Sequence, residues 1–184
     1  MPPDNRTSDA TASRGNGLLD QARALCISAH AGQWRANGDP YHTHPFAVAA
    51  LLAEHGMSDE EVLAAAYLHD VLEDSDTPRQ AIAEQFGERV ARLVDEMTLD
   101  EPSRRSFEAK QKALLAKARA MSDDAKWIKL ADRLHNLRDK IPGWSKEKRR
   151  RYADASLKLL EALSPWPSAS LAEEIRQLAG KFAT

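Results

Sequence analysis

The sequence has a single cysteine, no long apolar run and almost no net charge. With Cys26 alone among 184 residues, no intrachain disulfide can form, which favours a reducing cytoplasm. Cys26 lies between Leu25 and Ile27, so we expect a packed rather than a reactive thiol. No stretch is long enough to span a bilayer, and the polar start of the chain lacks the apolar segment of a signal peptide. These absences predict a cytoplasmic protein with no membrane partner.

The charge balance also argues against a polyanion-binding protein. The formal net charge is −2, so the chain has no general attraction to nucleic acid. The composition, 42% hydrophobic and 29% charged, is ordinary for a globular protein, and the length suits one domain. We expect residues 1–16 to be a flexible leader and residues 17–184 to be the domain. The composition leaves a homo-oligomer open.

No segment alternates apolar and polar residues over a useful length, which argues against strands. Apolar residues recur instead at helical spacing along most of the chain, and no internal repeat is visible. Capping residues, glycine and proline divide this pattern into short helices. The predicted fold class is therefore all-α. The expected helices cover 18–29, 45–54, 59–74 with a capping box at Ser58 and Glu61, 77–87, a helix through Val90, 107–121 as a covering element, a core helix from Ser122 to Pro142, one opened by Ser145, and 171–182.

Four ionisable residues interrupt the most apolar of these helices. Glu73 follows His69 by four residues and Asp74 follows Asp70 by four, so the four side chains share one side of a helix. Burying several carboxylates together is costly unless a cation is near. Carboxylate and imidazole are also the groups that bind divalent metals. The alternative is a solvated helix edge, although acidic residues are unfavourable near a helix C-terminus.

Two further positions favour the metal site over that alternative. His44 precedes Pro45 at a helix start, and Asp132 lies on a predicted core helix, where it shares a face with Lys129 and Asn136. A carboxylate on a core helix needs a partner. Two imidazoles and two carboxylates suit manganese, iron or zinc, with positions left for water and a substrate oxygen. The proposed ligands are His44, His69, Asp70 and Asp132.

Several motifs together make the chain similar to a known family. They resemble the hydrolase domain of the RelA/SpoT family, and the similarity covers roughly residues 19–138. Residues 143–152 extend it as in the small stand-alone alarmone hydrolases. About forty residues follow the last strong motif, so we expect no synthetase domain. The motifs are Ala29-His30-Ala31-Gly32-Gln33-Trp34-Arg35, Pro40-Tyr41, His44-Pro45, His69-Asp70 with Glu73-Asp74, Phe86-Gly87, Lys129 to Arg138, and Gly143-Trp144-Ser145 with Tyr152.

The resemblance implies an all-helical HD-domain bundle and a function. The expected enzyme is a guanosine-3′,5′-bis(diphosphate) 3′-pyrophosphohydrolase, which converts ppGpp or pppGpp to GDP or GTP and pyrophosphate. Family knowledge implies manganese at the four ligands and water activation by Glu73 and Asp74. It also implies nucleotide contacts from Arg35, Asn136, Lys148 and Tyr152. Departures from the family pattern at Tyr67, Ala36 and Lys148 leave base preference and the number of 5′ phosphates open.

Two alternatives remain at this stage. A general HD-domain nucleotidase or phosphodiesterase would use the same metal site, because the ligands alone do not encode the substrate. The loop over residues 32–41 argues against it. A non-catalytic, metal-stabilised protein that binds a nucleotide or a partner would need the ligands but not Glu73 and Asp74. The basic run over residues 146–151 is either a solvated face or a surface that steers an anionic nucleotide.

Overall fold

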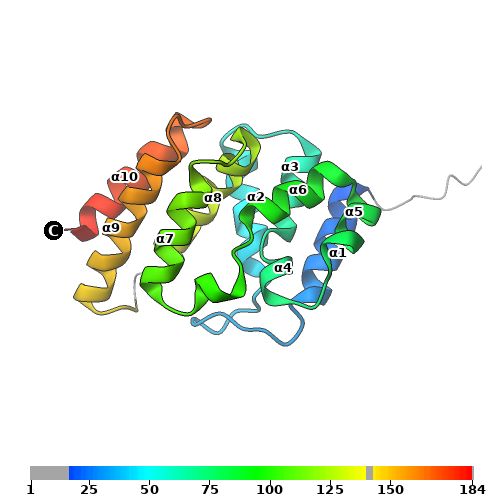
Figure 1. Cartoon of the computed structure of the whole chain (residues 1–184), viewed down its shortest axis with the longest axis horizontal. Coiled ribbons are helices and arrows are strands. Elements are labelled where there is room, and N and C mark those ends of the chain that lie inside the picture. Colours follow the sequence, from blue (N-terminus) through cyan, green and yellow to red (C-terminus); the bar gives the residue numbers. More distant parts are fainter. Residues whose placement is uncertain (1–16, 140–142, 184) are drawn as a thin grey trace, which may run out of the picture.

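The chain folds into a bundle of helices (Figure 1). The structure is a computed structural model that describes residues 17–139 and 143–183. In these two ranges the β interactions amount to one isolated bridge between Trp34 and Pro40, which confirms the all-α prediction. The elements are α1 (Leu18–Ala29), α2 (Thr43–Glu54), α3 (Glu60–Leu68), α4 (Val71–Asp74), α5 (Arg79–Phe86), α6 (Glu88–Met97), the 3₁₀ turn η1 (Glu101–Arg104), α7 (Phe107–Ala118), α8 (Asp123–Asp139), α9 (Lys146–Ala162) and α10 (Ala169–Ala183).

Most helix positions follow the sequence prediction, with one correction that matters for the site. The helix expected over 59–74 is broken into α3 and α4 by a turn at His69 and Asp70. At this turn the His69 ring donates from Nδ1 to the carbonyl oxygen of Ala66, 2.8 Å away. Both side chains of the turn, His69 and Asp70, face a common partner, His44. The end of α3 therefore coincides with the two residues that turn toward His44.

A second correction concerns the start of α3. The predicted capping box of Ser58 and Glu61 is wrong, because the N-cap is Asp59. Its Oδ1 accepts from the backbone N–H groups of Glu61 at 2.9 Å and Val62 at 3.4 Å. A carboxylate at this position satisfies orphan donors and complements the helix dipole, which explains its preference over the neighbouring serine. The expected leader, residues 1–16, and Pro142 lie outside the described residues.

Helix α3 lies at the centre of the bundle. It contacts α1, α2, α6 and α8, and small residues allow this close approach: Ala64, Ala65 and Ala66 are fully buried. Helices α9 and α10 pack together at one end of the molecule, and α1 and α5 lie at the other (Figure 1). The interior also contains Leu52, Leu68, Ile82, Leu93, Ile128, Leu130, Leu134, Leu137, Leu159, Leu163 and Leu171, each almost fully buried.

Cys26 is fully buried on α1, as its apolar neighbours predict. Burial raises the pKa of its thiol to about 12. The thiolate is the reactive form of cysteine, so Cys26 is a packing residue. None of the described helices has the length and apolarity to cross a bilayer.

Candidate metal centre and active-site cavity

Two helices and a turn bring the four predicted ligands together. His44 comes from the first turn of α2, His69 and Asp70 from the turn between α3 and α4, and Asp132 from the middle of α8. Donor atoms of the first three lie within 4.8 Å of one another. Asp132 joins them through Oδ1, which lies 3.2 Å from Nε2 of His44. The four residues predicted as metal ligands therefore form one cluster.

Hydrogen bonds fix which nitrogen of each histidine faces the cluster. His69 donates from Nδ1 to a carbonyl oxygen, so Nε2 of the neutral ring is an acceptor. That Nε2 is buried without a hydrogen-bond partner, and an oxygen of Asp70 lies 3.3 Å from it. The Nδ1 atoms of His44 and His135 lie 2.8 Å apart, which leaves Nε2 of His44 for the cluster. Such a bond orients a metal-binding ring.

Asp132 is held in place by its own helix. Lys129, one turn earlier, lies 3.1 Å from Oδ2, and the amide of Asn136, one turn later, donates to Oδ1 at 2.5 Å. These are the neighbours that the helical spacing predicted. Despite the cost of burial, Lys129 and His44 hold the pKa of Asp132 well below its usual value. The carboxylate is therefore ionised and available as a ligand.

The electrostatics of the cluster fit a bound cation. Burial opposes a charge on His69, yet the carboxylates of Asp70 and Asp132 raise its pKa to about 9. The same field that retains a proton on His69 stabilises a metal ion at this point. Burial lowers the pKa of His44, so its ring is neutral as a ligand requires. With a metal in place of the proton on His69, two imidazole nitrogens and two ionised carboxylates would form a donor set that suits a divalent transition metal.

Glu73 and Asp74 lie one turn beyond the cluster, but their side chains have different partners. Asp74 and Asp70 share the hydroxyl of Tyr41, at 3.1 and 2.8 Å respectively. Burial and the two carboxylates raise the pKa of Tyr41, so its hydroxyl stays protonated and donates. Glu73 instead accepts the backbone N–H of Leu99 through Oε1 at 2.6 Å. Asp70 and Asp74 therefore share one side, as the sequence predicted. The side chain of Glu73 points instead to the segment after α6.

Arg104 of η1 is a site residue that the sequence analysis missed. It donates to the carbonyl oxygen of Glu73 at 3.0 Å, and the same nitrogen lies 3.9 Å from the Glu73 carboxylate and 3.6 Å from that of Asp74. A cation at the C-terminal end of α4 satisfies an orphan carbonyl and offsets two negative charges. The polar segment preceding α7 gave no periodic signal from which this contact could be found.

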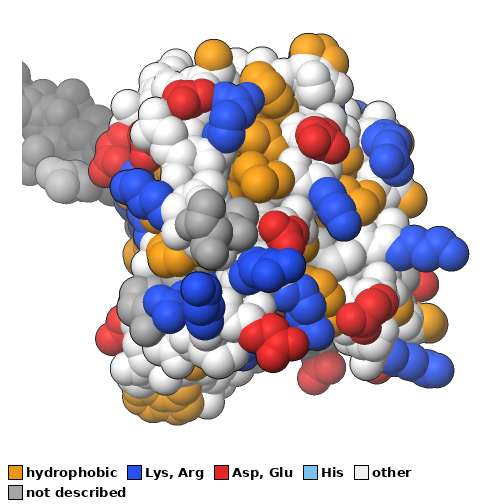
Figure 2. Space-filling model, turned by 90° about the vertical axis from the view of Figure 1, so that its left-hand side faces the viewer, with side chains coloured by type: hydrophobic (Ala, Val, Ile, Leu, Met, Phe, Trp, Pro, Cys, Tyr) orange, Lys and Arg blue, Asp and Glu red, His pale blue; other side chains and the backbone are white. Residues whose placement is uncertain are grey.

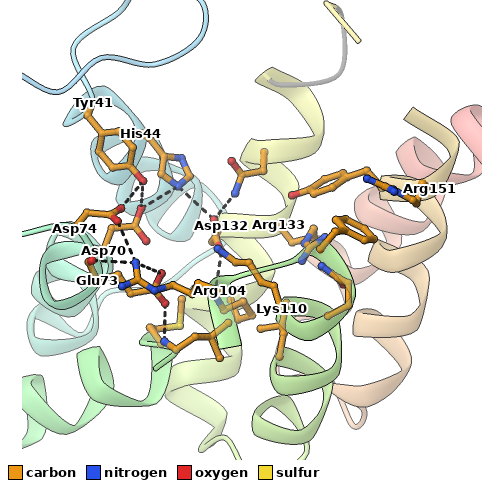
Figure 3. Close-up of a pocket in the computed structure, with 18 of the residues that line it drawn as sticks. Tyr41, His44, Asp70, Glu73, Asp74, Arg104, Lys110, Asp132, Arg133 and Arg151 are labelled. Carbon is orange, nitrogen blue, oxygen red and sulfur yellow. Dashed lines mark hydrogen bonds and ion pairs between the residues drawn. The ribbon is translucent and has the colours of Figure 1, made fainter. Parts of the chain in front are cut away.

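The cluster forms one end of a cavity of about 420 Å³. In Figure 3 the acidic residues Asp70, Glu73 and Asp74 lie at one side, Arg151 lies at the opposite side, and Arg133 lies between them. Helices α7 and α9 supply the wall there, so the expected covering role of α7 is confirmed. A space with carboxylates at one end and cations at the other suits a metal together with a polyanionic ligand.

Three of the four predicted nucleotide contacts line this cavity, and the fourth does not. Asn136, Lys148 and Tyr152 are on its wall. Arg35 is only 5% exposed in its side chain and donates to Asp139 from Nε at 3.1 Å and from a terminal nitrogen at 2.5 Å. It borders a neighbouring hollow with Trp34 and Lys148. In this structure Arg35 links the loop after α1 to the end of α8.

Comparisons with known proteins agree with this architecture. The HD domain family model matches residues 22–164. The GTP pyrophosphokinase rsh of Brucella ovis is 36% identical over 174 residues, which cover 90% of this chain and 22% of that protein. The bifunctional (p)ppGpp synthase/hydrolase SpoT of Escherichia coli K12 is 41% identical over 150 residues, covering 79% of this chain and 21% of that protein. The chain thus spans about a fifth of the length of these curated relatives.

A solved structure of nearly the same length is also similar. It is the structure of a metazoan ortholog of SpoT that hydrolyzes ppGpp, with a TM-score of 0.82 and 30% sequence identity, covering 92% of this chain and 98% of that one. A structure from Listeria monocytogenes EGD-e has a TM-score of 0.63 at 24% identity and covers 80% of this chain and 99% of that one, which supports the fold alone.

Proposed function

The chain belongs to the RelA/SpoT-type family of HD-domain hydrolases, and on this premise we propose that it hydrolyses the 3′-pyrophosphate of ppGpp and pppGpp. The products are pyrophosphate and GDP or GTP. The solved relative described as hydrolysing ppGpp supports this assignment, because its fold matches over almost its whole length. A buried, reduced Cys26 is consistent with a cytoplasmic enzyme.

The observation that carries the proposal is the division of charge within the cavity. A ligand set of two histidines and two aspartates lies at one end, and basic residues of α7, α8 and α9 line the other. A nucleotide that carries phosphates at both its 3′ and 5′ positions has the matching distribution of negative charge. A non-catalytic metal site would need neither Glu73 nor Asp74 beside it.

We propose manganese as the metal, held by His44, His69, Asp70 and Asp132. The mixed nitrogen and oxygen donors suit it, and Nε2 of His69 supports a cation here because it is buried beside the Asp70 carboxylate without a hydrogen-bond partner. A divalent metal supplies Lewis-acid polarisation of a phosphoryl group and makes water more acidic. Asn136, Lys129 and His135 keep the ligands oriented through the contacts described above.

Glu73 and Asp74 are the proposed catalytic carboxylates. They orient the attacking water and accept its proton as the bond between the ribose 3′ oxygen and the adjoining phosphorus breaks. The N–H of Leu99 and the guanidinium of Arg104 hold Glu73, and the hydroxyl of Tyr41 holds Asp74. These contacts fix the positions of the two carboxylates beside the proposed metal site.

The nucleotide contacts are proposed for the residues on the cavity wall. Lys148 supplies charge to phosphate, Asn136 presents a buried and unpartnered Oδ1 as an acceptor, and Tyr152 offers an aromatic surface beside Trp144. Arg35 was expected to contact the nucleotide directly. In this structure Asp139 engages it, so direct contact would require that pair to open.

Hydrolysis of matched nucleotides tests the proposal. Purified protein with manganese is incubated with ppGpp, with GDP, and with a 2′,3′-cyclic nucleotide as a general phosphodiester substrate. We expect pyrophosphate and GDP from ppGpp and no turnover of the other two, because only ppGpp carries a 3′-pyrophosphate. Orthophosphate from ppGpp, or comparable turnover of the cyclic nucleotide, would show a general HD-domain nucleotidase instead.

A further inference from the structure

The basic end of the cavity is formed by Arg133 of α8, Lys110 of α7 and Arg151 of α9, and the reaction proposed above gives none of the three an individual role. Arg151 lies far across the cavity from Asp70 and Asp74 in the close-up view, and Arg133 and Lys110 lie between them (Figure 3). We propose that this basic end binds the 5′-pyrophosphate of the substrate and so makes the enzyme selective for nucleotides phosphorylated at both ends. The inference rests on the proposed function.

The buried charge of Arg133 is the first feature that indicates an anionic ligand. It is 5% exposed and borders the cavity. Within the described part of the chain its contacts are neutral: its NH1 donates to the hydroxyl of Ser156 at 3.1 Å, and its guanidinium lies 4.7 Å from the centre of the Tyr152 ring. A buried charge without a counterion is costly. An anionic group in the cavity would supply the missing counterion.

Lys110 and Arg151 are also poorly neutralised by the protein. Among the described residues no ion pair involves Lys110, and Arg151 approaches a carboxylate only at 3.9 Å, that of the exposed Glu108. By contrast, two surface arginines outside the cavity are closely paired, Arg79 with Glu88 and Arg138 with Glu174. Lys110 and Arg151 are therefore available to a ligand in the cavity that they line.

Helix α9 adds to the same field. Its first two turns carry a dense run of basic residues, and the positive end of the helix dipole lies there too. This arrangement is unfavourable for the isolated helix, because like charges meet. Figure 2 shows the end of the molecule formed by α9 and α10, where Lys and Arg side chains are interspersed with Asp and Glu. An anion at the α7–α9 wall would relieve that repulsion.

Size and chemistry select a phosphate chain as the ligand. The metal cluster needs only one phosphoryl group nearby, and the remaining cavity, of about 420 Å³ in total, leaves room for the rest of a nucleotide. Arginine guanidinium groups bind phosphate with paired hydrogen bonds, and lysine adds a mobile charge. With the 3′-pyrophosphate at the metal end, the group that reaches the basic end is the one on the 5′ carbon.

The test compares two substrates that differ only at the 5′ position. One is ppGpp, and the other is guanosine 3′-diphosphate with a free 5′ hydroxyl. In the Lys110→Gln and Arg151→Gln double variant, kcat/KM for ppGpp should fall by roughly 100-fold, about tenfold for each charge-assisted contact. The value for the 5′-hydroxyl substrate should change by less than about twofold, since it makes neither contact.

Matched controls separate a local contact from a general effect of charge. Lys112 is exposed on α7, and Arg150 on α9 lies outside the cavity lining. The Lys112→Gln and Arg150→Gln double variant removes the same charge and should leave both substrates unaffected. Equal losses for both substrates in the Lys110 and Arg151 variant, or equal losses for ppGpp in both double variants, would overturn the inference.

A binding measurement keeps the inference separate from the proposed reaction. By calorimetry, wild-type protein should bind GDP more tightly than guanosine, and the Lys110→Gln and Arg151→Gln variant should lose at least about tenfold of that preference. If the preference is found and depends on these residues but ppGpp is not hydrolysed, the proposed function fails and the anion site stands. If ppGpp is hydrolysed but the Lys110→Gln and Arg151→Gln variant retains the preference for GDP over guanosine, the inference alone fails.

Discussion

Asp70→Ala protein will be isolated without its metal and will turn over ppGpp at least roughly 10³-fold more slowly than wild type, since metal assistance contributes several kcal/mol to such reactions. Asp70 contributes a carboxylate within 3.3 Å of Nε2 of His69 and 3.8 Å of Nε2 of His44. Its removal leaves too few donors to hold a cation tightly. The expected metal content, by elemental analysis, falls from about one per chain to near zero.

Thermal melting provides the second readout for Asp70→Ala. A metal that binds only the folded protein stabilises it, so manganese should raise the melting temperature of wild type and have little effect on the variant. Asp76, exposed just after α4, offers a matched control, and Asp76→Ala should retain both metal and activity. A variant at Asp70 that kept its metal and its manganese response would remove this residue from the ligand set.

Glu73→Gln protein is expected to keep its metal yet lose at least roughly 10²-fold in kcat, the usual cost of losing a positioned general base. The glutamine carbonyl can still accept the N–H of Leu99, so the link to the segment after α6 is retained. Metal content and melting temperature should therefore match wild type, and KM for ppGpp should change little.

The exposed Glu101, at the start of η1, serves as the control for this change, and Glu101→Gln should behave as wild type. Two results would contradict the catalytic role of Glu73. Full turnover in Glu73→Gln would show that Asp74 alone accepts the proton. A variant that loses stability but not turnover would show that Glu73 only anchors Leu99.

The helices were predictable from the sequence because local chemistry fixes their ends. Ser122 and Ser145 cap α8 and α9 as expected, with the serine hydroxyls accepting from Ala125 and Lys148. The break between α3 and α4 was not predictable, because no glycine or proline marks it. It depends on the His69 ring bonding to a helix carbonyl and on Asp70 turning toward a residue of another helix.

The cluster of the four proposed ligands could be predicted because few residue types bind metals and all four residues lie within or beside helices. Spacing along α8 alone indicated that Lys129 and Asn136 would flank Asp132. The side-chain partners of Glu73 could not be predicted in this way. The neighbour relations of a continuous helix end at the turn, and Leu99 and Arg104 belong to an irregular segment.

Ion pairs between residues far apart in the chain could not be predicted from a single sequence either. The pairing of Arg35 with Asp139 joins residues 104 positions apart and places a predicted nucleotide contact in a structural ion pair. The basic end of the cavity depends on three helices meeting, so Lys110 and Arg151 look like ordinary surface residues until the fold brings them to one wall. Hydrophobic periodicity identifies the buried face of a single helix, but it does not locate a cavity that several helices form together.

The central claim is that one divalent metal at the His44, His69, Asp70 and Asp132 cluster drives release of pyrophosphate from the 3′ position. Metal-free protein should be titrated with manganese while GDP and pyrophosphate are both quantified by anion-exchange chromatography. The account predicts that the two products form in equal amounts and that the rate rises with bound metal, levelling off at about one equivalent per chain. Full turnover by metal-free protein, or orthophosphate in place of pyrophosphate, would contradict it.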